Sequence, residues 1–172
     1  MNRGDHGDPV LTAMPPGSGK DRARTSIDLG DLKHPIVCAA HQVWQTLCGE
    51  RRMPSRVQMT PRIMREFLKY TALIEVLDGG REFRFRVSAD AVNLQQGMTL
   101  QGMTTADIDL RAPGYGTNLN RLYARVCRRR APHAYRGTYY RPTDGHAFSH
   151  ESIMLPLGED GETVDHVLVV AA

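Results

Sequence analysis

The sequence predicts an α+β domain with an antiparallel sheet, and three observations support this fold class. Five segments have the composition of β-strands, two before residue 90 and three after residue 130. Short Gly-containing turns connect the strands within each group, so strands that follow one another are expected to pair antiparallel. Between the two groups lies a long amphipathic segment, and a second amphipathic segment precedes the first strand.

The length of 172 residues suggests one domain with a tail. Residues 1–33 combine Gly, Pro and charged residues without a sustained apolar period. Such a composition does not bury enough surface to offset chain entropy, so we predict a disordered or flexible tail here. The folded domain is predicted to span residues 34–172.

Composition excludes several classes of protein. The net charge of +3 is too small for a dedicated nucleic-acid binder. No apolar run is long enough to cross a membrane, and residues 1–7 lack the apolar stretch of a secretory signal. The three cysteines form no CxxC pair, which fits a reducing compartment. We therefore expect a cytoplasmic protein that contacts neither membranes nor nucleic acid.

The first helix is predicted from Pro35 to the stop at Gly49. Its apolar residues fall on one stripe, namely Ile36, Ala40, Val43, Trp44 and Leu47. This stripe has two uses: it covers the outer face of the sheet, or it pairs with its copy in a homodimer, which we favour. A second, short helix is predicted to begin at Thr60–Pro61 and to run through Leu68.

The first two strands form a predicted hairpin. Residues 71–77 are apolar at nearly every position, as in a buried strand, and residues 78–80 read Asp-Gly-Gly, a hairpin turn. Residues 82–87 then alternate, with Phe83, Phe85 and Val87 on one face and charged residues on the other.

The middle of the chain is predicted to be helical. A short helix covers residues 89–96, Thr104 or Thr105 caps another turn, and a longer helix spans residues 115–130. The long helix carries a basic cluster of Arg121, Arg125, Arg128 and Arg129. This cluster is either a solvated helix face or a patch for an anion or a partner protein.

The last three predicted strands are residues 133–141, 147–155 and 164–170.

A motif near the end of the first helix carries a family resemblance. The pattern W-x-x-L-x-G-x-R-x-x-P-x-R is formed by Trp44, Leu47, Gly49, Arg51, Pro54 and Arg56. Further matches are the strand residues 84–86, the Gly-Met-Thr-Leu-Gln-Gly run at 97–102 and the segment 155–161. With the element order, these motifs resemble a PAS domain, and more narrowly a bacterial family of single-PAS proteins.

The resemblance implies a five-stranded antiparallel sheet with helices over one face and a helix before the first strand. It also implies a non-enzymatic sensor or regulator in signal transduction that binds a small ligand or a signalling partner. The side chains expected to line a ligand cavity, or else to fill a plain core, are Phe85, Val87, Val92, Met98, Leu119, Leu122, Tyr135, Phe148 and Met154.

This sequence lacks the residues that bind haem or flavin in PAS domains. The helix that carries the haem ligand in such domains has no His between residues 119 and 130, and residues 89–110 contain no Cys for a flavin. His146 and His150 lie in or beside a predicted strand, about 13 Å apart, so no metal site is expected. An unidentified small ligand remains the expectation.

The alternative is a small α+β enzyme with a cone-shaped pocket. Such an enzyme would use Asp/His acid–base chemistry, for which the sequence offers Asp90, Asp107, His133 and His150. It would also need six strands. None of these residues is paired by a recognisable spacing, so the sequence favours a protein without catalytic residues.

Overall fold

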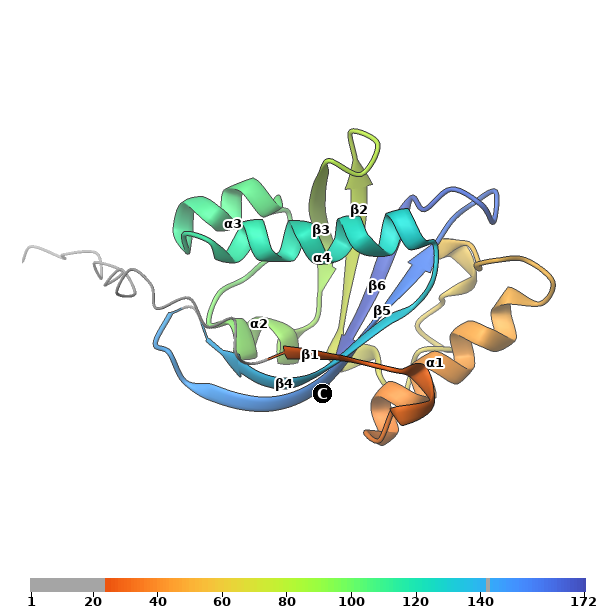
Figure 1. Ribbon diagram of the computed structural model, residues 1–172, viewed down its shortest axis with the longest axis horizontal. Helices are drawn as coiled ribbons and strands as arrows, with labels where there is room; N and C mark the ends of the chain where they lie inside the picture. The colour runs from red at the N-terminus through yellow and green to blue at the C-terminus, as the bar shows by residue number, and fades with distance from the viewer. Residues whose placement is uncertain (1–23, 142) are drawn as a thin grey trace, which may run out of the picture.

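The computed structural model describes residues 24–141 and 143–172, which form one six-stranded antiparallel sheet and four α-helices (Figure 1). The strands are β1 (Arg24–Ile27), β2 (Thr71–Leu77), β3 (Glu82–Ser88), β4 (His133–Tyr140), β5 (Ala147–Leu157) and β6 (His166–Ala171). The helices are α1 (Pro35–Cys48), α2 (Asp90–Gln96), α3 (Thr105–Arg111) and α4 (Tyr115–Arg129). The strand order is β1-β4-β5-β6-β2-β3.

Strand β1 corrects the predicted strand count from five to six. It pairs antiparallel with β4, with Ile27 opposite Ala134, and so extends the sheet beyond the five strands that were expected. The prediction of a tail through residue 33 is therefore wrong for residues 24–33. A four-residue strand without a hairpin partner leaves no local pattern to find. Residues 1–23 lie outside the described range, so a disordered tail there stays a prediction.

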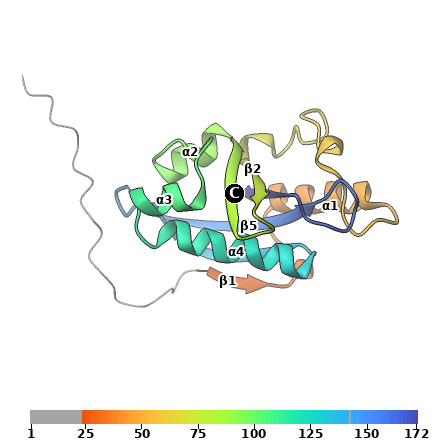
Figure 2. The same ribbon diagram turned by 90° about the horizontal axis from the view of Figure 1, so that it is seen from above.

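The helices cover the two faces of the sheet unequally. Figure 1 shows β4 and β5 curving beneath α2 and α4, with α1 outside this curve. Helix α4 packs against β3 and β5 and runs across the strands (Figures 1 and 2). Helix α1 packs against β5 and β6. Because side chains alternate along β5, Met154 faces α4 while Ile153 and Leu155 face the opposite side, where α1 lies.

The apolar stripe of α1 is used within the domain. Ala40 and Trp44 are buried together with Val37, and the Trp44 indole Nε1 donates a 2.8 Å hydrogen bond to the carbonyl of Pro156 on β5. The other stripe residues, Ile36, Val43 and Leu47, are half-buried against the same core. The stripe therefore covers the outer face of the sheet.

Two sequence-based predictions of local structure are wrong. Residues 61–67 form turns, followed by a 3-10 turn over Leu68–Tyr70, and not the predicted helix, although Met64 and Phe67 are buried as its apolar face would be. In β3, a β-bulge places Leu73 opposite Val87 but Ile74 opposite Phe85, so Arg86 is an extra residue. The alternation breaks there, and the Val87 side chain is 46% exposed.

No helix in the described part of the chain combines the length and apolar composition needed to span a bilayer.

Candidate functional site

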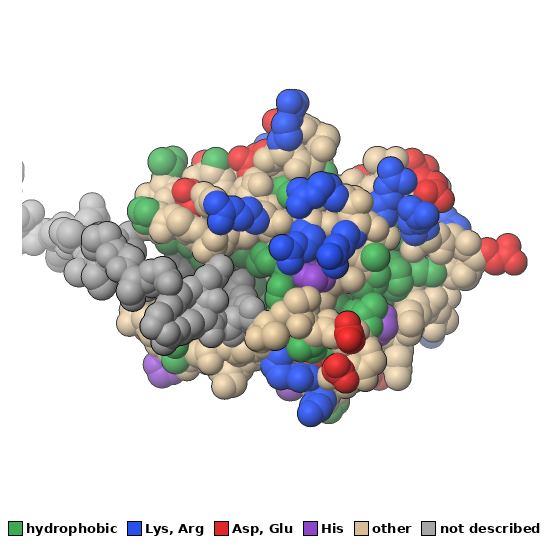
Figure 3. All heavy atoms as spheres, in the orientation of Figure 1, with side chains coloured by type: hydrophobic (Ala, Val, Ile, Leu, Met, Phe, Trp, Pro, Cys, Tyr) green, Lys and Arg blue, Asp and Glu red, His purple; other side chains and the backbone are tan. Residues whose placement is uncertain are grey.

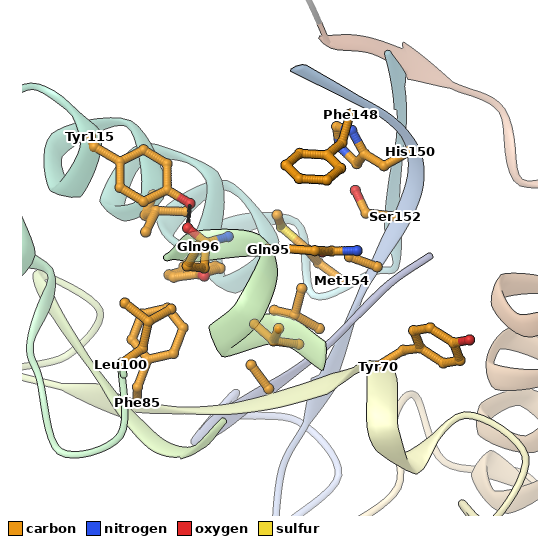
Figure 4. A pocket seen from close by; sticks show the side chains of 16 residues that line it. Tyr70, Phe85, Gln95, Gln96, Leu100, Tyr115, Phe148, His150, Ser152 and Met154 are labelled. Atoms are coloured by element: carbon orange, nitrogen blue, oxygen red, sulfur yellow. Dashed lines mark hydrogen bonds between the residues drawn. The ribbon is translucent and has the colours of Figure 1, made fainter. Parts of the chain in front are cut away.

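A cavity lies between the sheet and the helices α2 and α4 (Figure 4). Its volume is about 70 Å³, which is room for about two water molecules. It is lined by Tyr70, Ala72, Phe85, Val92, Gln95, Gln96, Leu100, Tyr115, Leu119, Tyr123, Phe148, His150, Ser152, Met154, Val169 and Ala171. Strand β5 contributes every second residue from Phe148 to Met154, because side chains on one face of a strand repeat with a period of two.

Polar contacts hold α2 over the cavity. The Ser88 hydroxyl donates to the Asn93 Oδ1 atom at 2.7 Å, and the backbone N–H of Leu100 donates to the same oxygen at 3.2 Å. The helix ends at Gly97, whose φ of 69° is in the left-handed region that favours glycine. At the other end of the cavity, the Tyr115 hydroxyl donates a 2.6 Å hydrogen bond to Gln96 Oε1 (Figure 4). This bond joins the start of α4 to the end of α2.

The hairpin between β4 and β5 folds back onto the same region. The Arg141 Nε atom donates to the Gln95 carbonyl at 3.2 Å, and the guanidinium lies 4.9 Å from the centre of the Phe148 ring. Arg141 also forms a 2.8 Å ion pair with Asp144. The end of α2 and the aromatic wall of the cavity are therefore held by one arginine.

The lining is aromatic and amide-rich. Tyr123 stands edge-on to Phe83 and Phe85, with ring centroids 5.5 and 6.2 Å away. Figure 4 shows Gln95 extending toward Ser152 on β5. No Asp, Glu, Lys or Arg side chain is among the described residues that line the cavity. The space of about 70 Å³ is smaller than most ligand sites, which measure about 300 Å³ or more.

The structure brings part of the predicted lining set together. Phe85, Val92, Leu119, Phe148 and Met154 line the cavity. The remaining predicted residues lie elsewhere: Val87 points to solvent because of the bulge, Met98 and Leu122 are half-buried, and Tyr135 is buried against His133.

Sequence reasoning missed the polar lining residues. His150 and Ser152 could have been found, because they share a β5 face with Phe148 and Met154. The glutamines of α2 carry no such signal, since a glutamine near a helix end is usually solvated.

Glu151 lies between two lining residues but points to the other face of the sheet. Its carboxylate accepts 2.9 Å hydrogen bonds from the backbone N–H groups of Lys33 and His34 and a charge-assisted bond from Arg136. Burial alone would raise its pKa, but the hydrogen bonds from His34, Arg136 and Lys33 outweigh burial and lower the pKa. This buried carboxylate anchors the segment that enters α1.

The basic cluster lies apart from the cavity interior. Arg121, Arg125, Arg128 and Arg129 are all exposed on α4. Next to them is His133, the first residue of β4, which is 6% exposed. Burial lowers the pKa of His133, and the nearby charges of Arg125 and Arg129 lower it further.

The acid–base candidates of the enzyme alternative are not brought together. Asp90 and Asp107 are exposed, and the Asp107 carboxylate caps α3 by accepting from the backbone N–H of Thr104. Of the four candidates only His150 lines the cavity. The sixth strand that the enzyme would need is present, but it is β1, added at the outer edge. Within the described ranges, no cluster of three or more His, Cys, Asp or Glu is placed to hold a metal ion.

Comparison with known proteins identifies the family. The model of a PAS domain matches residues 32–171, which include α1, the whole helical layer and strands β2 to β6. A search of curated proteins gave no match. PAS domains generally serve in sensing and signalling and not in catalysis, so a sensory or regulatory role follows from this match. With a single antiparallel sheet, a long helix across it and a family model over most of its length, the chain belongs to the PAS domain family.

Proposed function

We propose that this PAS domain is a non-enzymatic, cytoplasmic regulator that binds a small uncharged ligand in the cavity beneath α2 and α4. The signal would pass to a partner protein through the surface of the domain. The observation that carries the proposal is the lining itself, which combines aromatic walls with hydrogen-bonding amide, hydroxyl and imidazole groups. A charged ligand would lose its hydration there without gaining an opposite charge, which is unfavourable.

Strand β5 offers a direct route from the cavity to the outer face. His150 and Ser152 line the cavity, while Glu151 between them holds the backbone of Lys33 and His34 at the start of α1. A ligand that moves β5 by a fraction of an ångström therefore moves the anchor of α1. Such a shift can be transmitted because packed elements do not deform independently.

The proposal also includes a location and an oligomeric state. All three cysteines are free thiols, which fits a reducing compartment. A homodimer through α1 stays a prediction, and it would use the half-buried Ile36, Val43 and Leu47, because Ala40 and Trp44 are buried against the sheet.

Native mass spectrometry of the freshly purified protein tests the ligand directly. We expect a mass above that of the chain, by the mass of a small neutral molecule, that disappears after unfolding. The same spectra report whether the chain is a monomer or a dimer.

A matched pair of variants locates the site. Ser152→Leu places a larger apolar side chain in the cavity, whereas Ser149→Leu places it at an exposed position of the same strand. We expect the first variant to lose the retained ligand and the second to keep it. Retention of the ligand by Ser152→Leu would contradict the proposed site.

A further inference from the structure

Four arginines of α4 form a surface that has no acidic partner within residues 24–141 and 143–172. This α4 basic surface consists of Arg121, Arg125, Arg128 and Arg129, all exposed. Figure 3 shows basic side chains gathered over α4 in the middle of this face. Some other arginines of the domain form ion pairs, such as Arg136 with Glu151 and Arg141 with Asp144. Among the described residues, no ion pair involves the four arginines of the α4 basic surface.

The spacing of these side chains produces a row. Arg121, Arg125 and Arg129 are separated by four residues each, about 6 Å per step along the helix. Favourable interaction with the C-terminal end of the helix dipole accounts for basic residues in the last turn, where Arg128 and Arg129 lie. It does not account for Arg121 and Arg125, because the dipole effect fades within one turn.

His133 adds an independent observation beside this row. Its side chain is almost fully buried, and the Nε2 atom has no hydrogen-bond partner among the described residues. A buried polar atom left without a partner is unfavourable. Arg125 and Arg129 lie close enough for their charges to act on this ring. Two cations and an unsatisfied imidazole therefore adjoin one another at the end of α4.

We propose that the α4 basic surface docks an acidic segment of a partner protein, with carboxylates spaced to meet Arg121, Arg125 and Arg129. Charge complementarity is the reason, because carboxylates four residues apart on a partner helix have the same spacing of about 6 Å. A nucleic acid fits less well. The only exposed large aromatic side chain in the described part of the chain is Tyr140, so this surface has no platform on which bases would stack.

This inference rests on the proposed function in one respect, because a regulator needs a partner. It adds the surface and the chemistry of that partner. The opposite side of α4 contributes Leu119 and Tyr123 to the cavity. A partner bound to the arginines would therefore contact the same helix that covers the ligand.

The experiment uses the full chain and a helical peptide with glutamates at positions i, i+4 and i+8. Binding is followed by two-dimensional NMR of the labelled protein. We expect perturbations confined to the second half of α4 and to the His133 ring. The affinity should fall several-fold as salt rises from about 50 mM to about 300 mM, because salt screens exposed charges. A peptide with glutamine at the same positions should not bind.

A double variant and a matched control test the residues. Arg125→Ala with Arg129→Ala should weaken binding at least about tenfold. Arg62→Ala with Arg65→Ala removes the same charge from two exposed arginines outside α4 and should change the affinity less than about twofold. Circular dichroism confirms that each variant is folded. Equal weakening by the two pairs would show a non-specific charge effect and overturn the proposal.

Other outcomes also decide the matter. No binding of the glutamate peptide by the unmodified chain, or tighter binding of a short DNA duplex, would overturn the proposal. The proposal would also be overturned if the unmodified chain were a dimer that binds no peptide and the α4 double variant were a monomer. In that case the α4 basic surface would bind a second copy of the chain. Failure of the ligand proposal is distinguishable, since Ser152→Leu should still bind the peptide.

Discussion

At the scale of single residues, Glu151 is a buried polar residue whose carboxylate contacts several parts of the domain. The residue is 4% exposed, and its carboxylate accepts hydrogen bonds from two backbone N–H groups before α1 while pairing with Arg136. Arg136 also donates to the carbonyl of Asp31. One carboxylate thus joins β5, β4 and the segment between β1 and α1.

Replacing this carboxylate by an amide should destabilise the domain. Glu151→Gln is expected to cost roughly 2 kcal/mol at pH 7, because hydrogen bonds to a charged group contribute about 1.5–3 kcal/mol and Arg136 is partly exposed. Urea denaturation at pH 7 measures the loss. Glu66→Gln, at an exposed position, is the control and should change stability by less than about 0.5 kcal/mol.

The pH dependence of this effect has a definite sign. The pKa of Glu151 is lowered from its ordinary value of 4.5, so the folded state favours the ionised form. The stabilisation is therefore complete above pH 4.5 and is lost as the pH falls through the lower folded-state pKa. The stability difference between the unmodified chain and Glu151→Gln should shrink on acidification. A difference that stays constant down to pH 3 would contradict this role.

At the scale of elements, the packing of α3 on α4 depends on one glycine. Gly116 is in the first turn of α4, and a Cβ atom there would overlap the carbonyl oxygen of Thr105 and crowd the backbone of Asp109. The Asp109 carboxylate in turn accepts a 2.8 Å hydrogen bond from the backbone N–H of Thr117. The two helices can approach this closely only without a side chain at residue 116.

Gly116→Ala should therefore destabilise the domain despite the better helix propensity of alanine. The gain from propensity is about 1 kcal/mol, while overpacking costs about 1–3 kcal/mol and backbone atoms cannot move aside easily. The crowded atoms include backbone atoms, so we take the upper end of this cost and expect a net loss of about 2 kcal/mol by thermal or urea unfolding. Gly30→Ala is the control, because no atom lies within 4 Å of its added Cβ. Stabilisation by Gly116→Ala would show that α3 yields at little cost.

At the scale of the whole molecule, neither edge of the described sheet presents a long free strand, because one edge is the four-residue β1 and the other edge, β3, is partly covered by a loop. Strand β1 pairs with the free edge of β4. At the other edge, the Phe85 N–H donates to the Met103 carbonyl and the Gly102 N–H donates to the Phe85 carbonyl, so a loop covers part of β3. Very short edge strands and covered edges both protect a sheet from pairing with other chains.

Removal of β1 should thus promote self-association. A chain that begins at residue 28 leaves the edge of β4 without its partner, whereas a chain that begins at residue 24 keeps β1. We expect the shorter chain to form larger species in sedimentation velocity and to unfold at a lower temperature. If the two chains sediment alike at the same concentration, β1 is not needed to protect this edge.

Local patterns predicted most of the fold for a physical reason. The strand Thr71–Leu77 and the helix that begins at Tyr115 follow from composition and apolar spacing over their own residues. The cavity was predicted only where a residue lies on a regular strand or helix face, as for Phe85 and Met154. Val87 was misplaced because a bulge depends on the partner strand and not on the sequence of β3 alone.

The sequence by itself determined the α+β class, the succession of β2 to β6 along the chain and the family. It could do so because hydrophobic periodicity and turn residues act over short distances along the chain. Only the tertiary structure decided that β1 joins the sheet, that Glu151 anchors α1 and that His133 adjoins the arginines of α4. Each of these pairs residues from separate elements, and such contacts are set by the way the packed elements meet.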